Sequence, residues 1–349
     1  MAVRNPATRT TGKPGPVRSG LPGETLLRVQ YRLTDRDLTL LGWLADHGVL
    51  TTDQIAHALF PSLDFAQRRL LTLVRAGLLD RFRPLRPDGG SYPYHYVLAQ
   101  LGLDVVVAQR DGQDDRPTRD QARRRRWWLT NRANLPHLLA VNQFFTDLAG
   151  HARTHPGTSL ERWWSSARCQ RKGTWQEAAG VWSDARLHYV TIAADGHGIW
   201  ATTPPGTHDD LDGQATDRRN GAGMTVRVPF FVEVDLATED LPRLVGKLDA
   251  YQSWRKITGR TWPVLYWLTS TARETHLHDR LHHHPSPIPV ATAVHDPTTT
   301  PGTSPADRVW RLHRAAHWLH HPPETGRLTL ADLAATVTDP LTGHRPPDR

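Results

Sequence analysis

Residues 226–236 read VRVPFFVEVDL, and the alternation of side chains in this stretch predicts a β-strand. Apolar residues occupy every second position from the first residue to the last, and Phe231, Glu233 and Asp235 lie between them. Successive side chains of a strand point to opposite faces of the sheet. Two carboxylates therefore share one face of a strand whose other face is entirely apolar.

The residues after this strand predict an amphipathic helix over about 239–254. Its apolar stripe is formed by Leu241, Leu244, Val245, Leu248 and Tyr251. Lys247 lies ~60° around the helix from Leu244, on the margin of that stripe. From this position the ammonium group can lean toward the strand or extend into water.

Upstream, GVWSDARLHYV at 180–190 predicts a second acidic strand, with Asp184 near its start. Metal-assisted cleavage of a phosphodiester uses carboxylates to hold Mg²⁺, which activates a water, and a cation beside the reacting groups. Asp184, Glu233 and Asp235 are the candidate catalytic acids and Mg²⁺ ligands, and Lys247 is the candidate catalytic cation. Acidic strand ends and ion-paired lysines also occur in domains without catalysis, so a purely structural role stays open.

The N-terminal third of the chain shows helical spacing followed by two extended segments. Three short helices are predicted over about 34–48, 52–61 and 63–76, and extended segments over 78–84 and 92–99 flank the turn-forming RPDGG. Helix, helix, helix and hairpin in this order form the winged helix-turn-helix, whose third helix enters the major groove. The sequence therefore predicts a winged-helix domain that binds double-stranded DNA.

Two groups of arginines lie where this motif would contact DNA. The predicted third helix carries Arg68, Arg69 and Arg75, and the predicted hairpin carries Arg81, Arg83 and Arg86. The formal net charge is +8, and the residues up to Arg126 contribute +7 of it. This distribution favours a polyanion held mainly by the first third of the chain, because phosphate contacts dominate affinity for nucleic acids. The alternative is that these arginines only solvate a small helical domain.

Length and composition limit the class of protein. A chain of 349 residues is long enough for two domains, and we expect a mixed α+β or α/β fold. One cysteine, Cys169, excludes an internal disulfide framework and a thiolate zinc site within one chain. No run approaches the ~18 to 20 apolar residues of a membrane-spanning helix, and the first 20 residues lack a secretory signal pattern. We therefore expect a cytoplasmic protein without a membrane partner.

Changes in composition divide the chain into segments. We expect a disordered basic tail at 1–24, the winged-helix domain at 30–110, a charged linker at 111–128, a second domain at 129–320 with an exposed insertion at 195–223, and a Pro-rich tail at 322–349. The linker ends in RRRRWW, which is either a phosphate clamp or a solvated lead into a helix. The histidine-rich segment 276–284 is expected to be a solvated loop rather than a metal site.

Four segments together resemble a known family. LTDRDLTLLGWLADHGVLTTDQIAHALFPS at 33–62, RRLLTLVRAGLLDRFRP at 68–84, RWWSSARC at 162–169 and VPFFVEVDLATEDLPRLVGKLDAY at 228–251 resemble the replication-relaxation family of actinobacterial and other Gram-positive plasmids and integrated elements. That family is associated with plasmid replication and with relaxation of plasmid DNA. Its second half is similar to the PD-(D/E)XK nuclease fold, in which an acid after a proline, a second acid on the next strand and a lysine form the site.

The resemblance implies roles for particular residues of this chain. Asp184 would be the first acid, with Ser183 where proline is usual, and Glu233 would be the second. Asp235 stands where the lysine is expected, so Lys247 on the adjacent helix would replace it. Ser166 stands where many relatives carry a glutamate. The resemblance thus implies a Mg²⁺-dependent nicking endonuclease with a degenerate motif.

Three function classes follow from these observations. The first is a DNA-binding protein of a plasmid or mobile element that nicks DNA during replication, relaxation or transfer, with replication or transfer proteins as partners. The second is a winged-helix regulator or accessory factor whose nuclease-like fold has lost its chemistry. A tyrosine-nucleophile relaxase has little support, because no HxH-type histidine trio lies in the predicted core. The sequence does not determine the oligomeric state.

Overall fold

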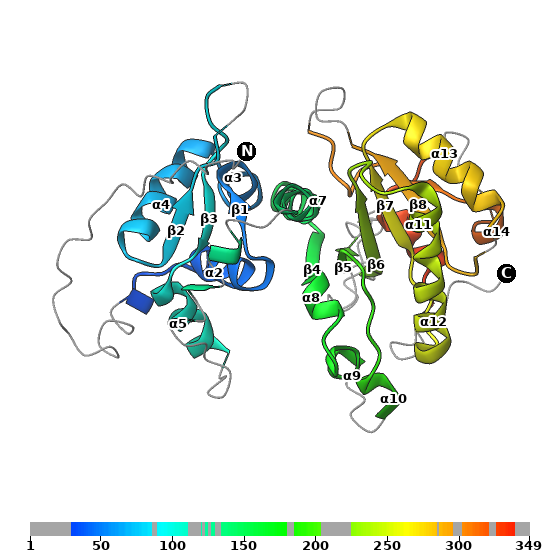
Figure 1. Ribbon diagram of the computed structural model, residues 1–349, viewed down its shortest axis with the longest axis horizontal. Coiled ribbons are helices and arrows are strands. Elements are labelled where there is room, and N and C mark those ends of the chain that lie inside the picture. The colour runs from blue at the N-terminus through cyan, green and yellow to red at the C-terminus, as the bar shows by residue number, and fades with distance from the viewer. Residues whose placement is uncertain are drawn as a thin grey trace, which may run out of the picture.

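The computed structural model describes residues 29–85, 89–110, 120, 123–124, 127–129, 134–179, 185–203, 225–284, 286–295, 302–320 and 326–338. Among these residues the chain forms two lobes joined by one long helix (Figure 1). The fold is mixed α+β, as the sequence predicts, and it has a three-stranded antiparallel sheet in the first lobe and a six-stranded mixed sheet in the second. None of the described helices is long and apolar enough to cross a bilayer.

The first lobe contains the three helices and the following hairpin that the sequence predicts, in the predicted order, together with two further elements. Its elements are α2 (Asp35–His47), β1 (Leu50–Thr51), α3 (Thr52–Leu59), α4 (Leu63–Arg75), β2 (Leu79–Phe82), β3 (His95–Leu98) and α5 (Gln100–Gln109). The strands pair in the order β1-β3-β2. The side chains of Thr34, Thr51 and Ser62 cap the first three helices by accepting backbone N–H bonds, which fixes where each begins. The sequence reading missed the short β1 and the helix α5.

The second lobe is a sheet covered by helices. It comprises α7 (Leu135–Thr154), β4 (Thr158–Ser165), α8 (Ser166–Cys169), α9 (Thr174–Ala179), α10 (Ala185–His188), β5 (Gly196–Thr202), β6 (Val226–Asp235), α11 (Leu241–Gly246), α12 (Leu248–Thr258), β7 (Val264–Leu268), α13 (Thr271–His282), β8 (Val290–Val294), β9 (Arg311–Leu312), α14 (Ala315–Trp318) and the 3₁₀ helix η1 (Ala331–Thr336). The strands lie in the order β4-β5-β6-β7-β8-β9. β6, β7 and β8 are mutually parallel, and β5 and β9 run antiparallel to their neighbours.

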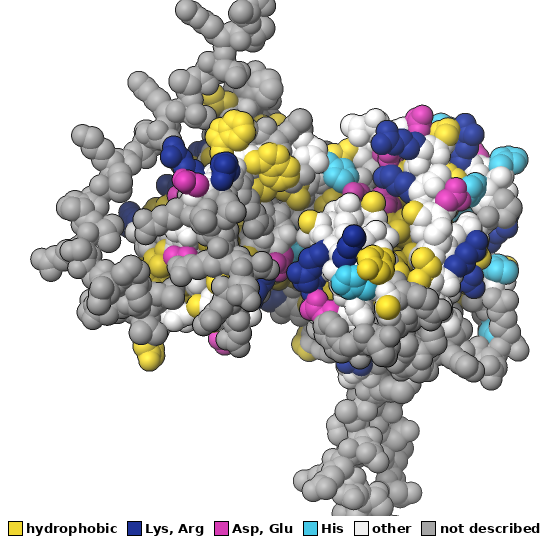
Figure 2. All heavy atoms as spheres, turned by 60° about the horizontal axis from the view of Figure 1, so that its bottom comes forward, with side chains coloured by type: hydrophobic (Ala, Val, Ile, Leu, Met, Phe, Trp, Pro, Cys, Tyr) yellow, Lys and Arg dark blue, Asp and Glu magenta, His cyan; other side chains and the backbone are white. Residues whose placement is uncertain are grey.

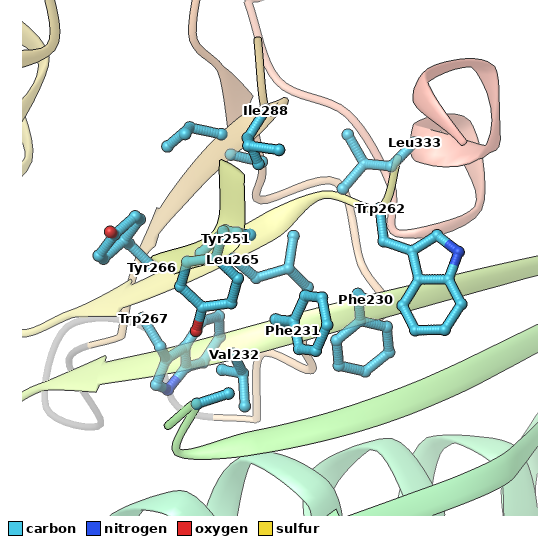
Figure 3. Close-up of a cluster of buried hydrophobic side chains, with 14 of the residues drawn as sticks. Phe230, Phe231, Val232, Tyr251, Trp262, Leu265, Tyr266, Trp267, Ile288 and Leu333 are labelled. Atoms are coloured by element: carbon cyan, nitrogen blue, oxygen red, sulfur yellow. The ribbon is translucent and has the colours of Figure 1, made fainter. Parts of the chain in front are cut away.

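The alternation predicted for β6 is present, and both faces of the strand are buried. Phe230 meets the ring of Phe144 on α7, with centroids 6.0 Å apart. Phe231 points to the other face, where Tyr251 and Trp254 of α12 lie with centroids 5.0 Å away. Figure 3 shows this cluster around β6 and β7. The face that carries Glu233 and Asp235 is therefore the face covered by α11, α12 and α13.

Three predicted elements differ in the structure. Residues 185–188, expected in a strand, form the helix α10, and the buried residues Leu187 and Val190 are three positions apart, as in a helical turn. Residues 196–202, expected in an exposed insertion, form β5 between β4 and β6. The rest of that insertion, 204–223, lies outside the described residues, as do the tail at 1–24, residues 322–325 and 339–349 of the Pro-rich tail, and most of the linker.

The histidine-rich segment is also a helix rather than a loop. The side chain of Ser270 caps the start of α13. The prolines of this region of the sequence come only after residue 284, so they do not interrupt the helix. His278 is buried, and its Nε2 lies 2.8 Å from Thr292 Oγ1 on β8. The predicted helix over 239–254 consists of α11 and α12, which meet at Lys247.

The long helix α7 packs against both lobes. Gln54 of α3 donates from Nε2 to the carbonyl of Leu139 at 2.8 Å, and Asn142 donates from Nδ2 to the carbonyl of Val49 at 2.7 Å. Trp163 of β4 stacks on His47 of α2, with ring centroids 3.7 Å apart. Buried amides and a stacked aromatic pair therefore hold the two lobes together.

Candidate functional site

The pairing of β5 with β6 brings two acids from distant parts of the sequence side by side. Gly196 is the partner of Val232 in this antiparallel pair. Asp195, one residue before Gly196, therefore lies beside Glu233, one residue after Val232. An antiparallel strand begins where its neighbour ends, so Asp195 lies near the carboxyl end of β6, where ligands commonly bind in such sheets.

Glu233 is almost fully buried and has a donor for each oxygen. Its side chain is 1% exposed. Oε2 accepts from Lys247 Nζ at 3.0 Å, and Oε1 accepts from the hydroxyl of Tyr251 on α12. Lys247 also contacts Glu239 Oε2 at 3.0 Å. Of the two positions that the sequence leaves open for the Lys247 ammonium, the structure has the one toward the acidic strand, and the junction of α11 and α12 places it there.

Asp195 is the acid that the sequence reading missed. Its Oδ2 accepts from the backbone N–H of Val234 at 2.9 Å and lies 3.2 Å from His137 Nε2 on α7. The side chains of Asp195 and His137 are 18% and 34% exposed, so the site opens to solvent on this side. A local signal in the sequence is that Asp195 directly precedes GHGI, in which small and large residues alternate, but its place beside Glu233 depends on strand pairing.

Asp235 does not join this group. Its Oδ2 accepts from Arg273 Nε of α13 at 2.6 Å, and its Oδ1 accepts from the backbone N–H of Ala237 at 2.9 Å. Its side chain is 2% exposed. These contacts give Asp235 a structural role at the end of β6. Asp184 lies outside the described residues.

Burial and neighbouring charges shift the pKa values of Glu233, Lys247 and Tyr251. Burial raises the pKa of Glu233, and the carboxylate of Asp195 raises it further, against the opposing effects of Lys247 and Tyr251. Burial alone would lower the pKa of Lys247, but the Glu233 carboxylate and the bonds to Glu239 and Glu233 raise it above its ordinary value. Burial and Glu233 also raise the pKa of Tyr251, so its hydroxyl keeps its proton and donates. Lys247 is thus a permanent cation beside a carboxyl that can exchange a proton.

The oxygen atoms of this site fit a hard cation such as Mg²⁺. Asp195 and Glu233 supply carboxylates, and the carbonyl of Val234 lies 3.0 Å from the same His137 nitrogen that contacts Asp195. Mg²⁺ commonly binds one or two carboxylates and keeps waters and substrate phosphates as its other ligands. In the described part of the chain, no three or more His, Cys, Asp or Glu side chains group so that they could hold a metal ion. A cation bound here would therefore need waters or other oxygen ligands beyond these side chains.

The arginines predicted to contact DNA differ in how they are engaged. On α4, Arg68 and Arg75 are exposed, whereas Arg69 donates from Nε to the buried Asp37 at 2.9 Å. On β2 and after it, Arg81 and Arg83 are exposed, and their guanidinium carbons lie 4.1 and 4.9 Å from the ring centre of Tyr94. Arg86 lies outside the described residues. Figure 2 shows one face of the molecule, on which basic side chains are interspersed with acidic, histidine and hydrophobic ones.

These features define a two-lobed α+β protein with a helical, hairpin-bearing first lobe and an acid–lysine centre at the strand ends of the second. The chain belongs to the replication-relaxation family, whose model matches residues 41–267. The match begins within α2 and ends within β7, so it covers parts of both lobes. Membership supports a role in replication or relaxation of plasmid or other mobile-element DNA. Neither a curated protein nor a solved structure matches the chain significantly.

Proposed function

We propose that this chain binds double-stranded DNA of a plasmid or other mobile element through its first lobe and nicks it with a Mg²⁺-dependent centre in its second. The observation that carries this proposal is that strand pairing places Asp195 beside Glu233, which is ion-paired with Lys247 from the junction of α11 and α12. Two acids on adjacent strands and a lysine are the groups that the resemblance to PD-(D/E)XK nucleases implies. Asp195 takes the role that the sequence reading gave to Asp184.

Each residue of the centre has a distinct role in this proposal. Asp195, Glu233 and the Val234 carbonyl would hold Mg²⁺, which supplies charge for the phosphodiester and lowers the pKa of a bound water. Lys247 keeps its proton and presents a positive charge beside the carboxylates, where it can contact a phosphate oxygen. Tyr251 donates to Glu233 and fixes the direction in which that carboxylate points.

The first lobe supports the DNA-binding half of the proposal. Its three helices and hairpin have the order of a winged helix, in which α4 would enter the major groove and β2 and β3 would form the wing. Arg68 and Arg75 on α4, with Arg81 and Arg83 on the wing, are exposed and can reach phosphates. Arg69 is left out of this set because its guanidinium is bonded to the buried Asp37, whereas the partner of Arg68 is the exposed Asp64.

A second candidate function, a DNA-binding regulator without catalysis, is favoured by one observation. Asp195, Glu233 and Asp235 each have a nitrogen partner: His137, which is charged only when protonated, Lys247 and Arg273, respectively. Acids paired in this way also occur in folds that carry out no chemistry. The two functions differ in whether DNA is cleaved.

A nicking assay on supercoiled plasmid with Mg²⁺ separates the two functions. The wild-type chain should convert supercoiled to open-circular DNA, and Asp195→Ala and Lys247→Met should each slow this by on the order of a hundredfold or more. Asp279→Ala, which alters an exposed acid on α13, should nick like the wild type. Equal nicking by Asp195→Ala and the wild type would exclude this centre. Absence of nicking by every protein would favour the regulator.

A binding assay on duplex DNA tests the first lobe separately. Replacing both Arg68 and Arg75 with alanine should weaken binding and reduce the slope of log K against log salt by about 2, because each phosphate contact contributes roughly 0.9. Arg280→Ala, which removes an exposed arginine on α13, should leave both quantities unchanged. If the double variant binds as tightly as the wild type, α4 is not the contact.

A further inference from the structure

His137 occupies a particular position in the centre. Its Nε2 lies 3.2 Å from Asp195 Oδ2 and 3.0 Å from the carbonyl oxygen of Val234. One ring nitrogen therefore contacts both oxygens at once. A carboxylate from the start of β5 and a carbonyl from the end of β6 converge on one point, and a nitrogen donor of α7 fills it.

A small hard cation that contacted both oxygens would have to sit close to that point. Mg²⁺ and Ca²⁺ bind carboxylate and carbonyl oxygens at about 2.0 to 2.6 Å, a range shorter than either contact of His137. The imidazole and the cation therefore compete for the same space and the same lone pairs. Because His137 is 34% exposed and lies in the first turns of α7, its side chain can turn into solvent without disturbing the core.

The face of α7 that carries His137 explains why the side chain reaches this site. Val141, Phe144 and Leu148 follow His137 at intervals of four, three and four residues and pack into the core of the second lobe. His137 continues this apolar face at the helix end, where the sheet core gives way to the acid–lysine centre. Its position is thus fixed by the same packing that docks α7 on the sheet.

We propose that His137 is a removable plug of the cation position: its ring nitrogen holds the Asp195 carboxylate and the Val234 carbonyl until a divalent cation displaces it. The inference rests on the proposed function, since it takes these oxygens to be cation ligands. It adds a residue that neither the family match nor the acid–lysine pattern assigns. Removing the imidazole should therefore tighten cation binding, whereas removal of a true ligand would weaken it.

Titration of the full chain with Ca²⁺, followed by calorimetry, tests the plug without measuring cleavage. His137→Ala should bind Ca²⁺ roughly tenfold more tightly than the wild type, because a hydrogen bond to a charged group no longer has to be broken. His137→Gln, which keeps a neutral N–H donor, should bind with an affinity between the two. His276→Ala, which removes an exposed histidine of α13, should bind like the wild type, and Asp195→Ala should abolish the binding.

The outcomes separate the plug from the proposed function. Tighter binding by His137→Ala, or by His137→Gln if the alanine variant does not fold, supports the plug. Unchanged or weaker binding by a folded His137 variant overturns it, while nicking by the wild type would keep the proposed function intact. If neither the wild type nor the His137 variants bind Ca²⁺, the plug is overturned, and loss of Mg²⁺-dependent nicking in the same preparation would overturn the nuclease as well.

Discussion

Removing the charge of Lys247 should destabilise the second lobe. Glu233 is 1% exposed and has two donors, Lys247 at 3.0 Å and Tyr251. Lys247→Met preserves the apolar stem and leaves a buried carboxylate with one neutral donor. Removing one partner of a buried ion pair costs about 3–5 kcal/mol. The cost should be smaller here, because the lysine side chain is 32% exposed and water can replace part of the contact. We expect the free energy of unfolding to fall by about 2 kcal/mol and Tm by roughly 4–8 °C.

The loss of stability in Lys247→Met should depend on pH, and the pKa of Glu233 determines whether that loss grows or shrinks as the pH falls. Burial and Asp195 raise that pKa in the folded chain above its value in the unfolded chain. The folded state therefore binds the proton more tightly, and it gains stability as the pH falls through the raised pKa. Without Lys247 the pKa rises further. The deficit of the variant should thus be largest above this raised pKa and should shrink as Glu233 becomes protonated.

Thermal melts followed by tryptophan fluorescence at about pH 8.5 and about pH 5.5 measure this dependence. Lys256→Met, which removes an exposed lysine on the same helix α12, is the matched control and should melt like the wild type at both values. Adding Glu233→Gln to Lys247→Met should restore most of the lost stability, because no buried charge is left. The reasoning is refuted if Lys247→Met melts with the control, or if its deficit is the same at both pH values.

Three further substitutions test particular contacts. Arg69→Ala should lower the free energy of unfolding by about 2 kcal/mol, because the buried Asp37 loses its partner. Arg68→Ala should change it by less than about 0.5 kcal/mol in the same urea melts, because the ion pair of Arg68 is exposed. Trp163→Ala should loosen the two lobes by removing the ring that stacks on His47, so limited proteolysis should separate them sooner than in the wild type. Proteolysis at the wild-type rate would show that the stack does not hold the lobes together.

The parts of the fold that the sequence predicts are those encoded by local spacing. The alternation over 226–236 places Glu233 and Asp235 on one face, and the helical angle of Lys247 places its ammonium near that face. The helix starts predicted at about residues 34 and 63 likewise agree with the caps that the structure shows at Thr34 and Ser62. Each of these features depends on residues within a few positions of one another.

Asp195 could not be found in this way because its role depends on strand pairing. Its strand is separated from β6 by a long polar segment, and only their register places Asp195 beside Glu233. The glycines that made this stretch resemble a loop serve close packing: a Cβ at Gly196 or Gly198 would overlap the ring of Phe145 or Phe230. The distinction between Arg68 and Arg69 is equally non-local, since it depends on a contact between α4 and α2.

The family match ends at residue 267, one residue before the end of β7, although the sheet continues through β8 and β9. β8 supplies the hydrogen-bonding partners of β7 from Val264 to Leu268. A chain shortened to the matched region would leave a row of backbone N–H and C=O groups unpaired along that edge of β7, a strand whose side chains are all hydrophobic. Such a row templates pairing with other chains, so the shortened protein should aggregate, and the segment beyond the match serves as the cover that keeps the sheet from doing so.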